Sequence, residues 1–105
     1  MTTDILTEII AHKRVEIAIQ ETAVPRMHLE KMLDDIHPCI RMSHALRTSS
    51  TGIIAEFKRR SPSKGWLHPD ADAALTAGYE QAGAAALSIL TDEKFFGGNL
   101  GDIRK

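Results

Sequence analysis

Residues 53–65, IIAEFKRRSPSKG, decide the fold, because they change from a short apolar run to a basic loop rich in serine, proline and glycine. Side chains alternate between the two faces of a strand, so Glu56 and Lys58 share one face with Ile54, and Phe57 lies on the other. A carboxylate and an ammonium at the end of an apolar strand are costly to bury unless they are paired or bind something. The following loop supplies hydroxyls, backbone N–H groups and cationic side chains. The stretch therefore predicts a strand that ends in a site for an anionic substrate.

A second apolar run follows a helical segment. Asp70 or Asp72 is a suitable N-cap for this helix, and Gly83 is a suitable end. Residues 84–91, AAALSILT, have the continuous apolar character of a buried strand. Strand, helix and strand within about forty residues form a β-α-β unit, which implies parallel strands joined by a right-handed crossover.

The last residues suggest that the sheet is larger than two strands. Residues 92–99 are predicted to form a loop, and residues 100–105 the start of another helix. Two parallel strands do not make a stable sheet, and a parallel sheet needs cover on both faces. The second strand would remain as an apolar edge, which favours self-association. The sequence therefore predicts the opening part of a larger α/β fold.

Two helices are predicted before the first strand. Thr3 or Asp4 would cap a helix that continues to about Ala23. A second helix would begin near Pro25 and close at His37.

The connection from these helices to the strand is less defined. Residues 39–46 are ambiguous, with Ser43 as a candidate cap of one short turn, and residues 47–52 are predicted as a polar loop. We therefore expect residues 1–51 to form a helical N-terminal extension and residues 52–105 to form the first β-α-β unit.

The composition predicts a globular protein, and the spacing of its histidines indicates no metal site. The 105 residues are 43% hydrophobic and 26% charged with a formal charge of −1, so no general attraction to nucleic acid is expected. No apolar run approaches the roughly 18 to 20 residues of a membrane span, and the N-terminus lacks a signal-peptide pattern. The single Cys39 excludes an internal disulfide and suits a reducing cytosol, and the histidines have no metal-ligand spacing. We predict a cytoplasmic protein with neither nucleic acid nor membrane as a partner.

Two stretches are specific enough to indicate a family. The motif Glu-x-Lys-x-x-Ser-Pro-Ser runs from Glu56 to Ser63, and Leu-Thr-Asp-Glu-x-Phe-Phe runs from Leu90 to Phe96. With its two-helix leader, the chain resembles the N-terminal part of the indole-3-glycerol-phosphate synthases, which are TIM-barrel lyases of tryptophan biosynthesis. The resemblance covers the whole chain but only the first part of such an enzyme.

The resemblance implies a fold and a reaction. The fold would be the opening portion of a (β/α)₈ TIM barrel, which needs about 250 residues, with two parallel strands preceded by the two-helix leader. The reaction would be ring closure, decarboxylation and dehydration of 1-(2-carboxyphenylamino)-1-deoxyribulose 5-phosphate to indole glycerol phosphate, without metal or organic cofactor. The family's general-acid lysine, general-base glutamate and main phosphate loops lie beyond these residues, so the chain alone is expected to be inactive.

Four residues match positions to which the family gives roles. Glu56 and Lys58 are the predicted catalytic residues: Glu56 would orient the sugar hydroxyls and the catalytic lysine, and Lys58 would contact the anionic groups of the substrate. Lys58, Ser61 and Phe96 are the predicted substrate-binding residues, with Ser61 near the carboxylate and Phe96 lining the anthranilate pocket. The alternatives are structural: an ion pair that only fills the interior, a turn cap at Ser61, and a loop anchor at Phe96.

The remaining cations of the loop are weaker candidates. A run of charge in a loop is usually solvated, which is the interpretation favoured for Arg60. Arg59 receives no firm role, and Lys64 is predicted on a mobile loop over the site, where it could steer the substrate.

Two other functions compete with the lyase. One is a non-catalytic barrel fragment that associates with itself through its exposed strand edge. The other is a different phosphosugar barrel such as an isomerase, since a fold does not fix a function. The Glu-x-Lys-x-x-Ser-Pro-Ser motif argues against the isomerase.

Overall fold

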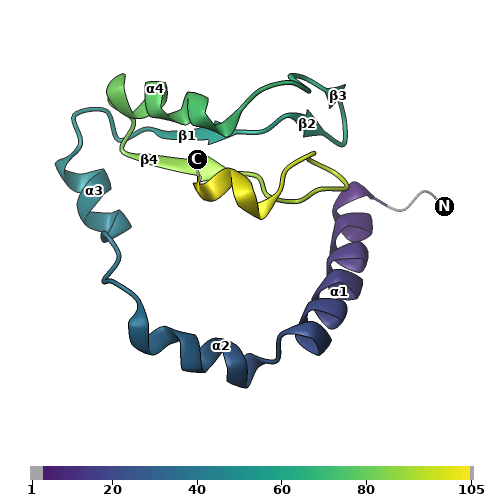
Figure 1. Ribbon diagram of the computed structural model, residues 1–105. Helices are drawn as coiled ribbons and strands as arrows, with labels where there is room; N and C mark the ends of the chain where they lie inside the picture. The colour runs from purple at the N-terminus through teal and green to yellow at the C-terminus, as the bar shows by residue number, and fades with distance from the viewer. Residues whose placement is uncertain (1–3, 105) are drawn as a thin grey trace. The chain divides into compact units, whose positions relative to one another are not determined.

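The computed structural model describes residues 4–104, apart from the side chain of Asp35. The chain divides into two compact units, residues 1–39 and residues 40–105. Figure 1 shows the order of the elements: the first unit is helical, and the strands of the described residues belong to the second.

Helix α1 spans Ile5–Ala23, where the sequence predicted a helix. Asp4 caps it, because its carboxylate accepts a hydrogen bond from the backbone N–H of Thr7 at 2.9 Å and from the hydroxyl of Thr7 at 3.0 Å. These two bonds, the backbone one first, favour the charged carboxylate and lower the pKa of Asp4 below its usual range. The predicted helix is confirmed with Asp4 as its cap, and the other candidate, Thr3, lies outside the described residues.

The second predicted helix is also confirmed. Helix α2 spans Arg26–Met32 and continues as the 3₁₀ turn η1, Leu33–Asp35. Pro25, whose backbone is extended, is its N-cap, so the helix begins at the next residue, in agreement with the predicted start near Pro25. The helical segment ends before Ile36, whose backbone is extended, and so slightly before the predicted end at His37.

Helix α3 spans Met42–Thr48 and resolves the ambiguous connection. The N–H of Ala45 already donates to the carbonyl of Arg41 at 3.0 Å, so Ser43 lies inside the first turn and does not cap it. The suggested cap at Ser43 is therefore wrong, and so is the start of the predicted loop 47–52, which belongs to α3.

The predicted β-α-β unit is confirmed. Strand β1, Ile54–Phe57, pairs in parallel with strand β4, Ala86–Ile89. The connection contains the 3₁₀ turn η2, Ala73–Leu75, and helix α4, Thr76–Gln81. Of the two candidate caps, the structure selects Asp72, whose side chain accepts a hydrogen bond from the N–H of Ala74 at 3.0 Å.

A short hairpin interrupts the segment that was predicted as loop. Strand β2, Arg60–Ser61, pairs antiparallel with strand β3, Gly65–Trp66. The N–H of Lys64 donates to the Ser61 hydroxyl at 3.1 Å, and Gly65 has a φ of 67°, which favours glycine. Two-residue strands carry no periodic signal, so the pattern of the sequence could not reveal them.

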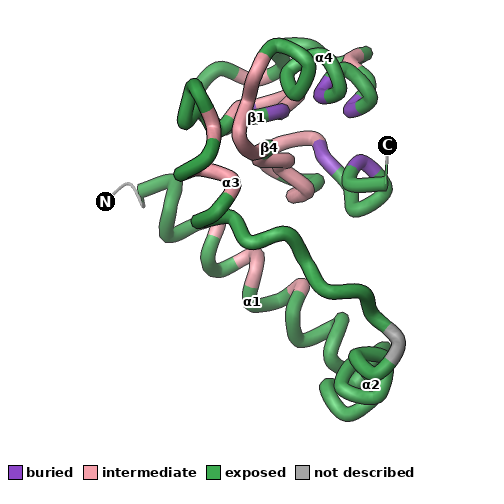
Figure 2. The backbone as a smooth tube through the Cα atoms, turned by 90° about the vertical axis from the view of Figure 1, so that its left-hand side faces the viewer, coloured by how far each residue is buried: buried purple, intermediate pink, exposed green. Residues whose placement is uncertain are grey.

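The core of the second unit lies on one side of the β1–β4 sheet. Phe57 is 5% exposed and Ala73 is fully buried, whereas Ile54, on the opposite face of β1, is 49% exposed. Helix α4 lies against both strands. Figure 2 shows buried positions on β1, near α4 and in the last 3₁₀ turn, η3, Leu100–Arg104. Strand β1 therefore has one covered face and one open face.

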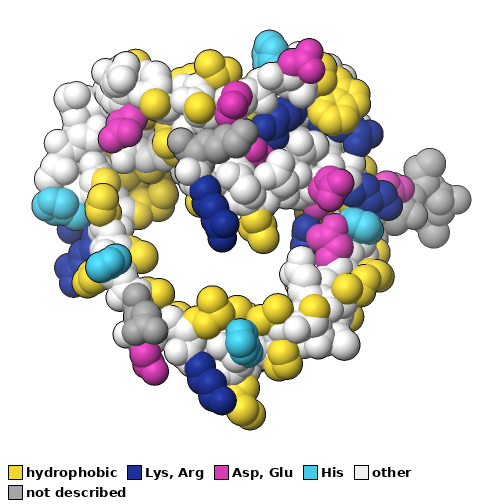
Figure 3. All heavy atoms as spheres, in the orientation of Figure 1, with side chains coloured by type: hydrophobic (Ala, Val, Ile, Leu, Met, Phe, Trp, Pro, Cys, Tyr) yellow, Lys and Arg dark blue, Asp and Glu magenta, His cyan; other side chains and the backbone are white. Residues whose placement is uncertain are grey.

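Large hydrophobic side chains also lie at the surface of both units (Figure 3), among them Leu6, Ile17, Leu75 and Leu100. The described residues of α1 and α2 include no buried position. Within residues 4–104, no helix combines the length and the apolar content needed to cross a membrane.

Candidate active site

Glu56 and Lys58 meet at the end of β1. The ammonium of Lys58 lies 3.6 Å from Oε1 of Glu56, with the two side chains 38% and 46% exposed. Because the parallel register pairs Glu56 with Ser88 of β4, the Ser88 hydroxyl donates to Oε2 of Glu56 at 3.2 Å. An ion pair this exposed is worth only about 0–1 kcal/mol, so both charges remain available to a ligand.

A cavity of about 420 Å³ borders the same strand. Its lining includes Glu56 and Phe57, which point to opposite faces of β1, and Leu75 and Tyr79 of the covering segment. A space that touches both faces lies at the edge of the strand, and within the described residues only β4 pairs with β1. Lys58 also lines this cavity, which therefore borders the Glu56–Lys58 pair.

Ser61 has the structural role that was considered as its alternative. Its side chain is buried, with 7% of the residue exposed, and its hydroxyl accepts a hydrogen bond from the N–H of Lys64 at 3.1 Å inside the hairpin. No hydrogen bond of the described residues joins Ser61 to Glu56 or Lys58. Its predicted contact with a substrate carboxylate stays a prediction.

Phe96 lies in the loop that follows β4, where the sequence placed it. The loop is a tight turn, because the N–H of Gly97 donates to the carbonyl of Glu93 at 2.9 Å and that of Gly98 to the carbonyl of Asp92 at 2.8 Å. Phe96 is half-buried. The turn therefore holds its backbone close to the end of β4, and its role as a pocket wall stays a prediction.

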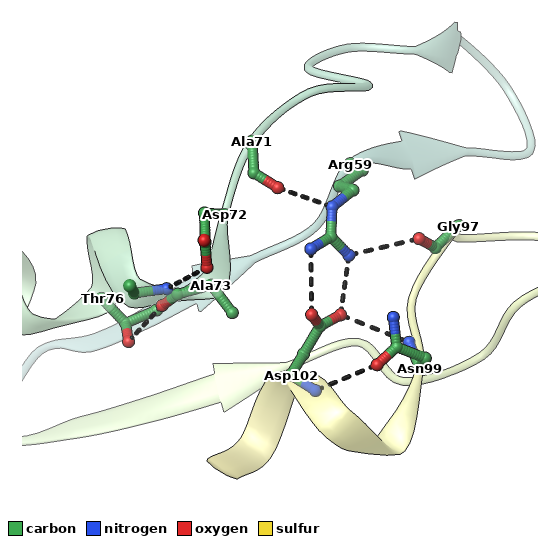
Figure 4. Close-up of polar contacts among 9 residues, drawn as sticks. Arg59, Ala71, Asp72, Ala73, Thr76, Gly97, Asn99 and Asp102 are labelled. Carbon is green, nitrogen blue, oxygen red and sulfur yellow. Dashed lines mark hydrogen bonds and ion pairs between the residues drawn. The ribbon is translucent and has the colours of Figure 1, made fainter. Parts of the chain in front are cut away.

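The most buried ion pair of the described residues joins Arg59 to Asp102 (Figure 4). The guanidinium makes two parallel contacts with the carboxylate, Nη1 to Oδ2 at 2.6 Å and Nη2 to Oδ1 at 2.9 Å, and the side chains are 12% and 2% exposed. Its Nε donates to the carbonyl of Ala71 at 2.7 Å, and Nη1 also donates to the carbonyl of Gly97 at 3.3 Å. Hydrogen bonding to Asp102 raises the pKa of Arg59 further above its ordinary value. The guanidinium stays charged and fixed.

Arg60 is not the solvated residue that was predicted. Its guanidinium lies 5.6 Å from the centre of the Trp66 ring and donates to the carbonyl of Lys94. Its Nε is buried and has no partner within the described part of the chain. The prediction is wrong because the hairpin, which the sequence did not indicate, turns this side chain onto Trp66.

Sequence reasoning missed two residues of this region. Ser88 is found only once the register of β1 and β4 is known, and Asp102 only once the chain after β4 has been placed beside Arg59. Neither position carried a local signal that would have singled it out. Among residues 4–104, no group of three or more His, Cys, Asp or Glu side chains is arranged to hold a metal ion.

Comparison with known proteins identifies the family. The family model of indole-3-glycerol phosphate synthase matches residues 6–105. Indole-3-glycerol phosphate synthase from Bacteroides thetaiotaomicron is 53% identical over 102 residues, which cover 96% of this chain and 39% of the relative. The enzymes of the same name from Neisseria gonorrhoeae and a Nocardioides species are 42% and 41% identical, over 92% and 95% of this chain and 39% of each relative. The chain thus spans about two fifths of the length of these curated relatives. A match that extends over nearly the whole chain establishes that it belongs to the indole-3-glycerol phosphate synthase family.

Proposed function

We propose that the protein to which this chain belongs is a carboxy-lyase that converts 1-(2-carboxyphenylamino)-1-deoxyribulose 5-phosphate to indole glycerol phosphate in tryptophan biosynthesis. The observation that carries the proposal is the Glu56–Lys58 pair at the end of β1, held on the open face of β1 by Ser88. The relatives that share this segment are named for that synthase. We expect the enzyme to work in the cytoplasm without a metal or an organic cofactor.

The proposed fold is a (β/α)₈ barrel that begins with this chain. The parallel β1–β4 pair, covered on one face by α4, has the arrangement of the first β-α-β unit of such a barrel. The face with Glu56 would become the barrel interior, and a closing strand would occupy the cavity beside β1. The division into an N-terminal extension, residues 1–51, and a barrel segment, residues 52–105, is part of this proposal.

Lys58 is the proposed contact for an anionic group of the substrate. In a closed barrel, water would be excluded from the open face, and the lower dielectric would strengthen the attraction between the ammonium and a carboxylate or phosphate. The present partner of Lys58 is held loosely, at 3.6 Å, so a substrate oxygen can take its place. Lys58 thereby positions the substrate for ring closure and offsets its charge.

Glu56 is the proposed orienting carboxylate of the same site. Ser88 occupies Oε2, which leaves Oε1 toward Lys58 and toward any sugar hydroxyl that enters. A carboxylate accepts hydrogen bonds, so it fixes donors such as hydroxyls and ammonium groups. Ser61 and Phe96 complete the proposal as contacts of the substrate carboxylate and aromatic ring, and the remaining acid, base and phosphate groups come from the rest of the enzyme.

A chimaera tests this function. Residues 1–105 are joined to the remaining part of the Bacteroides thetaiotaomicron relative, whose matching segment is 53% identical, and formation of the indole product is followed by fluorescence. The chimaera should be active, and Lys58→Ala should lower kcat/KM by about 100- to 1,000-fold, the range for loss of one electrostatic contact to a reacting group. Lys31→Ala, which removes an exposed lysine of α2, is the matched control. An inactive unmutated chimaera would contradict the proposed synthase function. If the Lys58→Ala chimaera had the kinetics of the unmutated one, Lys58 would be a structural residue.

Self-association is the second candidate for the isolated chain. Ile54 of β1 is 49% exposed, and within the described residues β1 and β4 pair only with each other. Apolar strands with an unpaired edge favour pairing with other copies. The isolated chain should sediment as an oligomer and show no turnover. A monomer, or an active isolated chain, would contradict this expectation.

A further inference from the structure

The Arg59–Asp102 pair lies at the junction of the proposed site. Arg59 directly follows Lys58, and its guanidinium donates to the carbonyl of Gly97, which directly follows Phe96. Figure 4 shows the same guanidinium reaching Ala71, ahead of η2, and Asp102 of η3. One side chain thus connects the end of β1, the approach to α4 and the loop after β4.

The geometry of the Arg59–Asp102 pair holds the two side chains in one orientation, in addition to balancing their charges. The two contacts of 2.6 and 2.9 Å form a planar fork, which defines the orientation of the guanidinium as well as its distance. The ring of Phe57, buried in the core, lies 5.0 Å from the guanidinium carbon. Arg59 is therefore held from several sides, and the backbone that carries Lys58 is held with it.

Asp102 is itself oriented by its own segment. Its Oδ2 accepts a hydrogen bond from the N–H of Asn99 at 3.3 Å, and its N–H donates to the side-chain carbonyl of Asn99 at 3.1 Å. The carboxylate is 2% exposed. Burying a carboxylate this deeply costs desolvation free energy, which is offset only if its ion-pair partner and its hydrogen bonds hold it in one geometry.

We propose that Asp102 is a positioning residue of the synthase, acting through Arg59 to set the spacing between the strand end with Lys58 and the loop with Phe96. These two segments bear the proposed contacts for the anionic groups and for the aromatic ring of one substrate. A change in their spacing would misplace one contact relative to the other. The inference rests on the proposed function, since it concerns how that site is assembled.

Three variants of the active chimaera test this role. Asp102→Asn removes the charge and one acceptor of the fork, and Arg59→Lys keeps the positive charge but removes the fork. Each should lower kcat/KM by about 10- to 100-fold, the effect of a displacement near 1 Å at a reacting site. Glu30→Gln is the control, because it makes the same carboxylate-to-amide change in the exposed pair with Arg26 and should leave kcat/KM unchanged.

A double-mutant cycle separates positioning from general damage. The affinity for indole glycerol phosphate, measured by calorimetry, avoids turnover and can be determined even in inactive variants. If Asp102 acts through Arg59 on the position of Lys58, Asp102→Asn weakens product binding in the parent but adds little in Lys58→Ala. A loss of the same size in both backgrounds would overturn the inference. Circular dichroism confirms that each variant is folded at the assay temperature, and Arg59→Lys decides the matter if Asp102→Asn does not fold.

The outcomes for the function and for this inference are distinguishable. An inactive unmutated chimaera overturns the proposed function and the inference with it. An active chimaera in which Asp102→Asn or Arg59→Lys is folded and keeps the parental kcat/KM overturns the inference alone.

Discussion

Replacing Gly98 with alanine tests whether close packing holds the loop that carries Phe96. A Cβ on Gly98 would lie 1.8 Å from the carbonyl oxygen of Leu90 and 2.8 Å from its carbonyl carbon, whereas real Cβ contacts essentially never fall below 3.0 Å. Both atoms belong to the main chain, so the two backbones must separate by roughly 1 Å rather than let a flexible side chain move aside. The turn resists this, because the N–H of Gly98 donates to the carbonyl of Asp92 at 2.8 Å.

The separation of the two backbones at Gly98 should lower the free energy of unfolding. Overpacking of this kind destabilises proteins by about 1–3 kcal/mol, which a urea unfolding curve of the chimaera, followed by far-UV circular dichroism, readily resolves. A shift of the same size at the neighbouring Phe96 should lower kcat/KM by up to about 100-fold. Gly98→Ala should therefore reduce both stability and activity.

Gly78→Ala is the matched control for Gly98→Ala. A Cβ at Gly78 meets nothing within 4 Å, and the residue lies inside α4. Because alanine favours a helix over glycine, this change should stabilise the chimaera by about 0.8–1 kcal/mol and leave its activity unaltered. The reasoning is refuted if Gly98→Ala is as stable as the parent.

Two further predictions concern the core and the first helix cap. Phe57→Ala should lower the free energy of unfolding of the chimaera by about 3–5 kcal/mol in urea, because Phe57 is buried, and Phe57→Leu should lower it less; a loss below about 1 kcal/mol for Phe57→Ala would contradict its place in the core. The pKa of Asp4 is lowered in the folded chain, so its capping contribution is present above the pKa of the unfolded chain and is lost as the pH falls through the folded pKa. An NMR titration should place that pKa below the value in an unstructured peptide, and Thr7→Ala should raise it by removing the side-chain bond; titration at the peptide value would refute the cap.

The helices and the two parallel strands could be predicted because their signals are local. Asp4 and Asp72 lie directly before helical segments and accept backbone hydrogen bonds from them, as N-cap residues do. Pro25 separates α1 from α2, because its ring removes the backbone N–H and would clash with a preceding helical turn. The alternation along β1 also placed Glu56 and Phe57 correctly on opposite faces, because a strand has a period of two.

The hairpin β2–β3 was not predictable in this way, and one wrong prediction followed from it. Arg60 belongs to a charge run that usually lies in solvent, but the hairpin turns Trp66 back onto it. The contact also depends on Gly97, where a Cβ would lie 2.8 Å from the Trp66 ring. An arginine that stacks on a ring several residues later depends on tertiary packing, so composition alone assigns it to the surface.

The contacts that define the candidate site depend on the register of the two strands and join residues that are far apart in the sequence. A slip of β4 by two residues would keep every side chain on its face and yet remove the Ser88–Glu56 bond, so the alternation pattern cannot select Ser88. The sequence after β4 contains several carboxylates that could pair with Arg59. Its polar and apolar pattern gives no reason to prefer Asp102 over Asp92 or Glu93. Folding selects Asp102 because η3 brings it to a buried guanidinium whose charge must be paired where water is excluded. The same requirement explains why a pair that could not be predicted is the most buried ion pair of the described residues, and why its disruption should affect the neighbouring Lys58.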